Sequence, residues 1–494
     1  MSVSMSIRQL ARSVLILASA MIFALPLALE AGKPVPVTVT AANPSQAIQG
    51  AELDVIISGT GFGNGSTVKY LVTGTTDASQ VTVLSVTYLP ASGQLKTHIK
   101  VNGEAVTTYY DIEVLAATGR KGKGTTLFKV NLDPSVILPV SLGTPTGCSN
   151  SMGTGLNNGA YPAGLIVSTD TWSCTTGKDR LYRWQNGIWY DLGTLPGAVK
   201  GVAEGVSDNG TVAGMLLNSA NINTAVVVSN AGALEVLPAP AGVFNTETMG
   251  ISEDGRHIFG NITLQPINNI SEGYATRWNL DLDGNWNIEL ISAQQSYVGT
   301  WPWGTSDDGS VIVGYSNYSS EHPDPVLRNR NEGWAWLEGA PPDWVTLGLD
   351  TLAFDVSPRG EVIVGRRLRN NPDTTQTSLA VYWVLDSSGN WVRHDLAGLD
   401  AEGSSAEGVG QVNGKLVIVG FAFAGSSGVP RAVAWLPRGD GSYGAPIRLA
   451  AIDGKSSASS FAEDVNANGV VVGRSGISKS SSVRAVLWML PAIP

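Results

Sequence analysis

Aromatic and charged side chains gather in one part of the sequence with the chemistry needed to hold a sugar ring. Trp301 and Trp303, in "GTWPWGTS", interrupt an otherwise repetitive pattern and are expected in a connection between two repeats, and tyrosines and arginines follow in the next two predicted connections. Aromatic faces stack on sugar rings, and charged groups bond their hydroxyls. The candidate ligand-binding residues are Trp301, Trp303, Tyr315, Tyr318, Asp324, Arg328 and Arg366.

A second interpretation of the two tryptophans is structural: they fill the mouth of a central channel, because large aromatic side chains usually pack. Catalysis would need a general base with a partner, for example His322 with Arg328, or the carboxylate pair Asp307 and Asp324. Aspartates that precede glycine are also good turn formers. The sequence has no Gly-x-Ser-x-Gly elbow and no phosphate-binding loop, so no catalytic residue is assigned.

The cysteines Cys148 and Cys174 are the two thiols of the chain, and we expect them to form a disulfide in an oxidising compartment. The sequence places them in two neighbouring connections of the first repeat. The four histidines are scattered and do not create a zinc-ligand spacing with the cysteines. We therefore predict neither a metal site nor a cofactor.

Seven polar turns that end in glycine recur at intervals of 45 to 55 residues and divide the larger part of the chain into repeats. A strand that ends in tryptophan follows most of these turns, although the second copy ends on Val228 instead. The turn glycines are Gly159, Gly210, Gly255, Gly309, Gly360, Gly414 and Gly469. The strand-ending tryptophans are Trp184, Trp278, Trp336, Trp383, Trp435 and Trp488.

Seven copies with four short strands each predict a seven-bladed β-propeller over residues 135–494. The last copy ends without its outer strand. Residues 136–144, "VILPVSLGT", align with the outer strand "WYDLGT" of the first copy, so we expect them to pair with residues 484–488 and close the last blade. The tryptophans at equivalent positions should pack between blades.

The repeats resemble the extracellular HAF-repeat family. The residues that carry the resemblance are "DLGTLPG" at 191–197 and the stretch from Ala203 to Gly214. The resemblance implies export and a propeller-like fold, and it carries no agreed activity and no catalytic residues.

Residues 35–130 form a separate unit of alternating strands and glycine turns. It resembles the immunoglobulin-like IPT/TIG family through Ser58, Gly59, Gly61, Phe62 and Gly63. The resemblance implies a β-sandwich that serves as a spacer or contact module.

Residues 1–31 have the features of a Sec-type signal peptide, because Arg8 and Arg12 precede an apolar run that ends in small residues. Loss of Arg8, Arg12 and Glu30 changes the formal net charge from −10 to −11. An acidic surface repels phosphate groups, so nucleic acid is excluded as a partner, and no integral membrane segment is expected after cleavage.

The sequence thus predicts an all-β protein, with an N-terminal Ig-like sandwich and a seven-bladed β-propeller whose last blade is closed by an N-terminal strand. We expect a secreted, periplasmic or cell-surface binding or interaction module whose ligand is a glycan or a protein. The alternative is a polysaccharide-active lyase or hydrolase that uses the loop-rich propeller face.

Overall fold

The chain forms two compact units that divide after residue 132, and each is described by itself. The predicted signal peptide, residues 1–31, lies outside the described residues. The computed structural model describes residues 35–493 except 103–104, 132, 134–135, 265–272, 292–296, 321, 340–342, 371–375, 400–402, 425–427, 455–456 and 479.

The first unit consists of two four-stranded sheets, in the orders β1-β3-β6-β5 and β2-β8-β7-β4. The alternating residues expected from the sequence provide the inward faces. The strands are β1 (Thr38–Asn43), β2 (Gln46–Ile48), β3 (Glu52–Thr60), β4 (Thr67–Val72), β5 (Val81–Leu89), β6 (Gln94–Val101), β7 (Tyr109–Leu115) and β8 (Lys121–Asn131).

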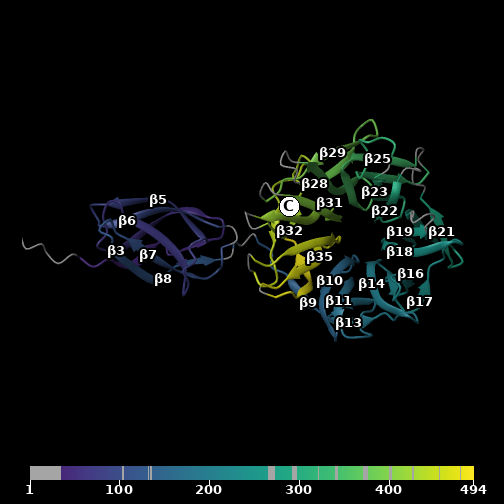
Figure 1. Ribbon diagram of the computed structural model, residues 1–494, viewed down its shortest axis with the longest axis horizontal. Helices are drawn as coiled ribbons and strands as arrows, with labels where there is room; N and C mark the ends of the chain where they lie inside the picture. The colour runs from purple at the N-terminus through teal and green to yellow at the C-terminus, as the bar shows by residue number, and fades with distance from the viewer. Residues whose placement is uncertain are drawn as a thin grey trace, which may run out of the picture. The chain divides into compact units, whose positions relative to one another are not determined.

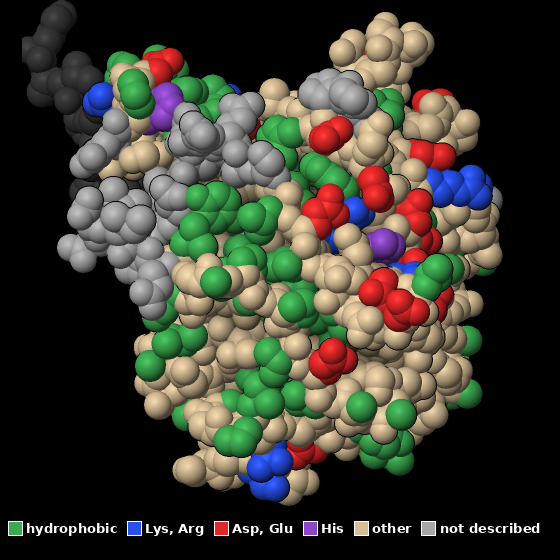
Figure 2. Space-filling view, turned by 90° about the vertical axis from the view of Figure 1, so that its right-hand side faces the viewer, with side chains coloured by type: hydrophobic (Ala, Val, Ile, Leu, Met, Phe, Trp, Pro, Cys, Tyr) green, Lys and Arg blue, Asp and Glu red, His purple; other side chains and the backbone are tan. Residues whose placement is uncertain are grey.

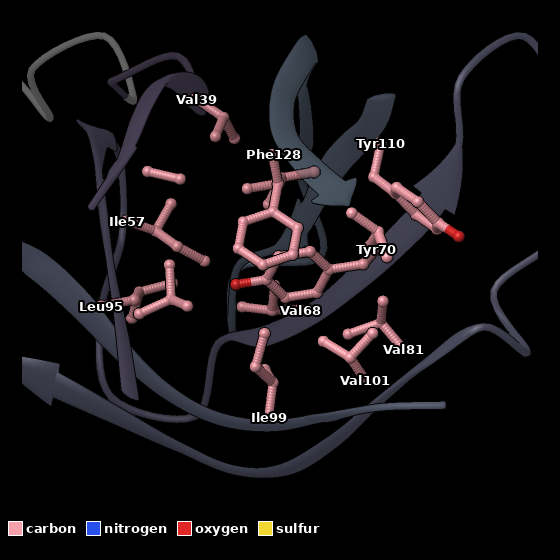
Figure 3. Packing of buried hydrophobic residues seen from close by; sticks show 14 of the residues in the cluster. Val39, Ile57, Val68, Tyr70, Val81, Leu95, Ile99, Val101, Tyr110 and Phe128 are labelled. Atoms are coloured by element: carbon pink, nitrogen blue, oxygen red, sulfur yellow. The ribbon is translucent and has the colours of Figure 1, made fainter. Parts of the chain in front are cut away.

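Apolar side chains from both sheets share one core, in which the Tyr70 and Phe128 rings meet edge to face at 5.2 Å between centroids (Figure 3). The Tyr70 hydroxyl lies 3.0 Å from the Thr97 hydroxyl of the other sheet. Gly59 allows β1 and β3 to pair, because a Cβ there would lie 2.0 Å from the Thr38 carbonyl oxygen. Gly59 of this stretch therefore has a local structural reason.

The second unit is also built from strands alone in its described residues, in seven four-stranded groups that we call sheets 1 to 7 in chain order. Sheets 1 and 2 are joined by a single strand pair, Asp170 with Val202. Figure 1 shows that the sheets follow one another around a common axis.

Sheet 1 contains β10 (Cys148–Leu156), β11 (Ile166–Cys174), β12 (Tyr182–Gln185) and β13 (Ile188–Asp191). Sheet 2 contains β14 (Ala198–Val206), β15 (Val212–Asn218), β16 (Asn223–Val228) and β17 (Leu234–Val236). Sheet 3 contains β18 (Val243–Ile251), β19 (His257–Leu264), β20 (Gly273–Leu280) and β21 (Trp286–Leu290). Sheet 4 contains β22 (Tyr297–Thr305), β23 (Val311–Tyr318), β24 (Asn331–Leu337) and β25 (Trp344–Leu349).

Sheet 5 contains β26 (Thr351–Val356), β27 (Val362–Asn370), β28 (Gln376–Leu385) and β29 (Trp391–Asp395). Sheet 6 contains β30 (Ser404–Val412), β31 (Lys415–Ala424), β32 (Val429–Trp435) and β33 (Ile447–Leu449). Sheet 7 contains β34 (Ser460–Val465), β35 (Val470–Gly476), β36 (Val483–Met489) and, from the start of the unit, β9 (Val140–Gly143).

Strand β9 pairs antiparallel with β36, with Ser141 opposite Val486 and Val140 opposite Leu487. This strand pairing is the one expected from the alignment of residues 136–144. Sheets 7 and 1 also contact each other, since the Asn466 side-chain amide donates to the carbonyl oxygen of Asn157 at 2.9 Å. The two ends of the unit therefore meet.

The strand-ending tryptophans are buried, and four of them tie their sheet to the one before it. The indole N–H groups of Trp278, Trp383, Trp435 and Trp488 donate to carbonyl oxygens near the outer strand of the preceding sheet, for example Trp278 to Pro238 at 2.7 Å and Trp488 to Ala450 at 2.9 Å. This contact explains why the repeat retains tryptophan, as a residue that packs and donates at once.

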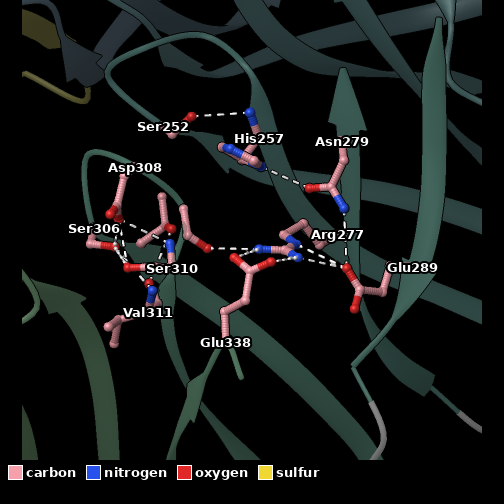
Figure 4. Close-up of polar contacts among 12 residues, drawn as sticks. Ser252, His257, Arg277, Asn279, Glu289, Ser306, Asp308, Ser310, Val311 and Glu338 are labelled. Atoms are coloured by element: carbon pink, nitrogen blue, oxygen red, sulfur yellow. Dashed lines mark hydrogen bonds and ion pairs between the residues drawn. The ribbon is translucent and has the colours of Figure 1, made fainter. Parts of the chain in front are cut away.

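The arginine before the tryptophan provides a second tie between sheets. Arg277 of β20 donates to the Gly309 carbonyl oxygen in the turn of sheet 4 at 3.0 Å, and its guanidinium lies between Glu289 and Glu338 (Figure 4). It also stacks on Trp336, with 4.7 Å between the guanidinium carbon and the ring centroid. Arg277 and the tryptophans are therefore structural residues.

Candidate functional site

Every innermost strand of the second unit carries a β-bulge at the same place, one residue before the strand approaches its polar turn. A bulge inserts one extra residue and re-aims its side chain. The seven bulged residues are Thr154, Glu204, Met249, Trp303, Phe354, Glu407 and Glu463.

All seven bulged residues line one cavity of about 330 Å³, to which all seven sheets contribute. Sheets 3, 4 and 5 contribute the apolar side chains Met249, Trp303 and Phe354. The remaining four sheets contribute three glutamates and a threonine. The cavity therefore has an aromatic wall and a polar wall, within the size range of small-ligand pockets.

Acidic side chains dominate the charge of this cavity, and its described lining includes no lysine, arginine or histidine. Acidic side chains are also more prominent than basic ones on the outer face shown in Figure 2, in line with the net charge of −10. The lining carboxyl groups are Glu204, Glu253, Asp307, Asp355, Glu407, Glu463 and Asp464.

Two of these carboxylates have a structural role. The Asp355 carboxylate accepts from the Val409 backbone N–H of the next sheet at 2.8 Å, and Asp464 accepts from Leu156 N–H at 3.2 Å. Glycine occupies the equivalent position elsewhere: a Cβ at Gly304 would lie 2.5 Å from the Asp355 Cα. The inner strands therefore approach one another closely at this level.

Burial within the ring of sheets is the main reason that the pKa values of the other carboxyls rise. The pKa of Glu204 is raised to about 8 by burial and by the charge of Asp170. Burial and the charge of Glu407 raise the pKa of Glu463 to about 7. Burial and a hydrogen bond with Asp208 raise the pKa of Glu253 to about 10. At neutral pH these pKa values favour the protonated forms of Glu204 and Glu253.

The aromatic wall includes one predicted binding residue, Trp303, and Phe354, which was not predicted. Three other predicted residues, Trp301, Tyr315 and Arg366, contact this group without lining the cavity. Trp303 is 41% exposed and stacks on Tyr315, with 6.3 Å between the ring centroids. Phe354 meets Trp303 edge to face at 5.7 Å, and the Arg366 guanidinium lies 5.3 Å from the Phe354 ring centroid. Trp301 lies against the other side of the group, 5.7 Å from Tyr315.

The predicted positions of these residues need correction. Trp301 and Trp303 lie within the inner strand β22, and not in a connection between sheets; Pro302 is tolerated there because the inner edge strand bulges beside it. Tyr315, Tyr318 and Arg366 lie in second strands, because these hairpins are longer than expected. Residues 265–272 and 371–375, in the connections from β19 to β20 and from β27 to β28, lie outside the described residues.

The remaining three predicted residues lie in or beside the connection from β23 to β24. The buried Tyr318 donates its hydroxyl proton to Glu332 at 2.7 Å. Exposed Arg328 donates to the His322 carbonyl oxygen, and the Asp324 carboxylate accepts from Val326 N–H, so both support the connection itself. Neither the pair His322 and Arg328 nor the pair Asp307 and Asp324 presents a described catalytic contact between side chains.

The predicted disulfide between Cys148 and Cys174 is confirmed, with the Cα atoms 3.9 Å apart. The cysteines are the first residue of β10 and the last of β11, opposite each other in register. They therefore end two paired strands, whereas the sequence had placed them in two connections.

The sequence did not lead us to predict the bulged position, which supplies seven residues of the candidate site. It stands between two small or restricted residues just before each turn, as in "AEG" at 203–205, "PWG" at 302–304 and "AFD" at 353–355. The flanking residues repeat along the chain while the central residue varies. This variation within an internal repeat is the signal that could have identified all seven cavity residues.

The described part of the chain contains no helix that is long and apolar enough to cross a membrane. Nor do its histidine, cysteine, aspartate and glutamate side chains form a group of three that could hold a metal ion.

No protein-family model matches this sequence, and no curated protein matches it. Solved structures that align with it include a DUF4784 family protein from Bacteroides caccae, at 10% identity and TM-score 0.22, covering 83% of this chain and 94% of that one. An AofleA mutant from Arthrobotrys oligospora has 10% identity and TM-score 0.29, with 63% and 94% covered. A mutant of the Aleuria aurantia lectin AAL in complex with Fucα1-6GlcNAc has 15% identity and TM-score 0.29, with 61% and 97% covered. At these TM-scores the likenesses carry no argument about the ligand.

Proposed function

We propose that this chain is an exported binding protein that holds a glycan ring in the cavity at the centre of its second unit. The observation that carries the proposal is the convergence of the seven bulged residues on one cavity, where Trp303 presents an exposed face opposite carboxyl groups. A sugar uses both kinds of wall, because its ring stacks while its hydroxyls form hydrogen bonds.

The architecture within this proposal is a seven-bladed β-propeller, in which sheets 1 to 7 are the blades and β9 closes the ring. The β9 to β36 pairing and the contact between sheets 7 and 1 support it. We retain the HAF-repeat and IPT/TIG resemblances as part of the proposal. The disulfide supports an exported protein, since such bonds persist in oxidising compartments.

The second candidate function is a polysaccharide-active hydrolase. One observation favours it: Glu407 and Glu463 come from neighbouring sheets and influence each other, and the pKa of Glu463 is raised to about 7. Glycosidases use two carboxyl groups, one protonated and one ionised. Binding is the simpler function, because it needs only the walls that the cavity already has.

The test is to incubate the purified protein with a glycan panel and to analyse both retention and product mass. Binding predicts retained, unmodified oligosaccharides, and Trp303→Ala should lose retention. Tyr190→Ala is the matched control, because Tyr190 is 38% exposed on the outer strand β13. Cleaved products would favour the hydrolase, and retention that survives Trp303→Ala would place the site elsewhere.

A further inference from the structure

Among the bulged glutamates of the cavity, Glu204 is the one with neither a hydrogen-bond partner nor an arginine beside it in the described part of the protein. It is the bulged residue of β14, and its side chain forms no hydrogen bond or ion pair with another described residue. The basic group whose charge reaches it is Lys200, yet the Lys200 ammonium pairs with Asp170 at 3.4 Å. An ionised carboxylate without a counter-charge is costly inside a protein, so an external cation would complete this position.

The other two bulged glutamates differ from Glu204, because arginines lie beside them. The Glu463 carboxylate is 3.9 Å from the Arg474 guanidinium, and the charges of Arg366 and Arg474 both act on Glu407. Arginines therefore provide positive charge beside Glu407 of sheet 6 and Glu463 of sheet 7, whereas no described arginine does so for Glu204 of sheet 2.

The aromatic wall is an independent observation about the rest of the ligand. Trp303 and Phe354 come from sheets 4 and 5, two and three positions further around the ring than Glu204. Aromatic faces of this kind stack on sugar rings. A ligand in this cavity meets an aromatic face on one side and an unpaired carboxyl on the other.

The spacing of the carboxyl groups distinguishes an organic cation from a metal ion. Calcium and magnesium need several oxygen ligands at close range, and no three acidic, histidine or cysteine side chains of the described residues are grouped in that way. A cavity of about 330 Å³ is instead the size of a small organic ligand.

We propose that the ligand is an amino sugar, whose protonated primary amine pairs with Glu204 while its ring stacks on Trp303. This inference rests on the proposed glycan-binding function and narrows its ligand class. It assigns Glu204 as the residue that distinguishes a free amine from an N-acetyl group or a hydroxyl, because neither of these carries a positive charge.

The test is isothermal titration calorimetry of the full-length mature chain at pH 7 with four probes: a β-1,4-glucosamine tetrasaccharide, its fully N-acetylated form, cellotetraose, and 1,4-diaminobutane. We expect the glucosamine probe to bind at least about tenfold more tightly than the two neutral sugars, as for a charge-assisted contact. Glu204→Gln should remove this preference. Glu235→Gln, an exposed glutamate on β17, should retain it.

Equal affinity for the glucosamine, N-acetylated and cello-oligosaccharides would overturn the inference and leave glycan binding intact. Equal affinity for the glucosamine tetrasaccharide and 1,4-diaminobutane would support recognition of a cation by Glu204 and would contradict the glycan-binding function. Because the comparison of probes uses the unaltered chain, it remains decisive if Glu204→Gln fails to fold.

Discussion

At the scale of single residues, the cavity separates side chains that hold the protein together from side chains that are free to bind. Asp355 and Asp464 satisfy backbone N–H groups of neighbouring sheets, and four of the repeated tryptophans donate to carbonyl oxygens. Trp303 and Glu204 form no such hydrogen bond between sheets among the described residues, and each is the extra residue of a bulge in its strand. Binding and stability should therefore respond to different substitutions.

Trp303→Ala should lower glycan affinity roughly tenfold or more and change the melting temperature little, because an exposed ring contributes little packing. Trp301→Ala should lower the melting temperature and change glycan affinity little. The half-buried Trp301 ring packs on Gly299, where a Cβ would lie 2.4 Å from the ring. Calorimetry and thermal unfolding of both variants check this. A large loss of stability in Trp303→Ala with affinity retained would support the channel-plug interpretation.

Protonation of Glu204 should make stability depend on pH. The pKa of Glu204 is raised by burial to about 8, well above that of an unfolded glutamate, so the folded state binds more protons between those two values. Stability is therefore full at low pH and falls as pH rises toward 8. The neighbouring groups Asp170, Lys200 and Glu247 act on the same carboxyl.

Glu204→Gln should consequently raise the melting temperature at pH 8, by about 2 to 4 °C, and leave it nearly unchanged at pH 5. Thermal unfolding at both pH values is the measurement, with Glu235→Gln as the control. An equal shift at both pH values would show that the effect is packing and not ionisation.

At the scale of strands and sheets, the bulge recurs at the same place in every inner strand, while the type of the bulged residue differs from sheet to sheet. The sequence predicted the four-strand copies, the polar turns and the pairing of β9, because these depend on local periodicity and turn residues. It misplaced Trp301, Trp303 and the cysteines, which it read as connections and which belong to strands. The alternation within one strand cannot locate a bulge, because the extra residue is visible only against the partner strand. The comparison of the repeats with one another is the sequence signal that could have identified these residues.

The same reasoning explains the missed acidic wall. Glu204, Glu407 and Glu463 read as ordinary polar positions in an alternating strand. Only the closing of the strands around one axis brings side chains together that are more than a hundred residues apart in sequence.

The disulfide should stabilise sheet 1, because it joins the ends of β10 and β11 and closes a loop between residues separated by 26 positions. Replacing both cysteines by serine should lower the free energy of unfolding by about 2 to 4 kcal/mol. Urea unfolding under non-reducing conditions measures it. Unchanged stability would mean that the β10 to β11 pairing holds this hairpin without the bond.

At the scale of the whole second unit, β9 from its beginning pairs with β36 near its end. Leu142 of β9 is 6% exposed and packs in the core shared by sheets 7 and 1. Leu142→Asp should destabilise the unit by several kcal/mol, because it buries a charge at the closure. Leu138→Asp is the matched control, since Leu138 is 56% exposed. Similar melting temperatures for both variants would argue against closure by β9.

We infer that the seven bulged residues form the ligand site, and the decisive measurement is a crystal structure of the protein with bound glucosamine tetrasaccharide. We expect a sugar ring in the central cavity, within about 4 Å of the Trp303 indole, with its amine on Glu204. Sugar bound on the outer strands or on the connection from β23 to β24, with the cavity free of ligand, would contradict it.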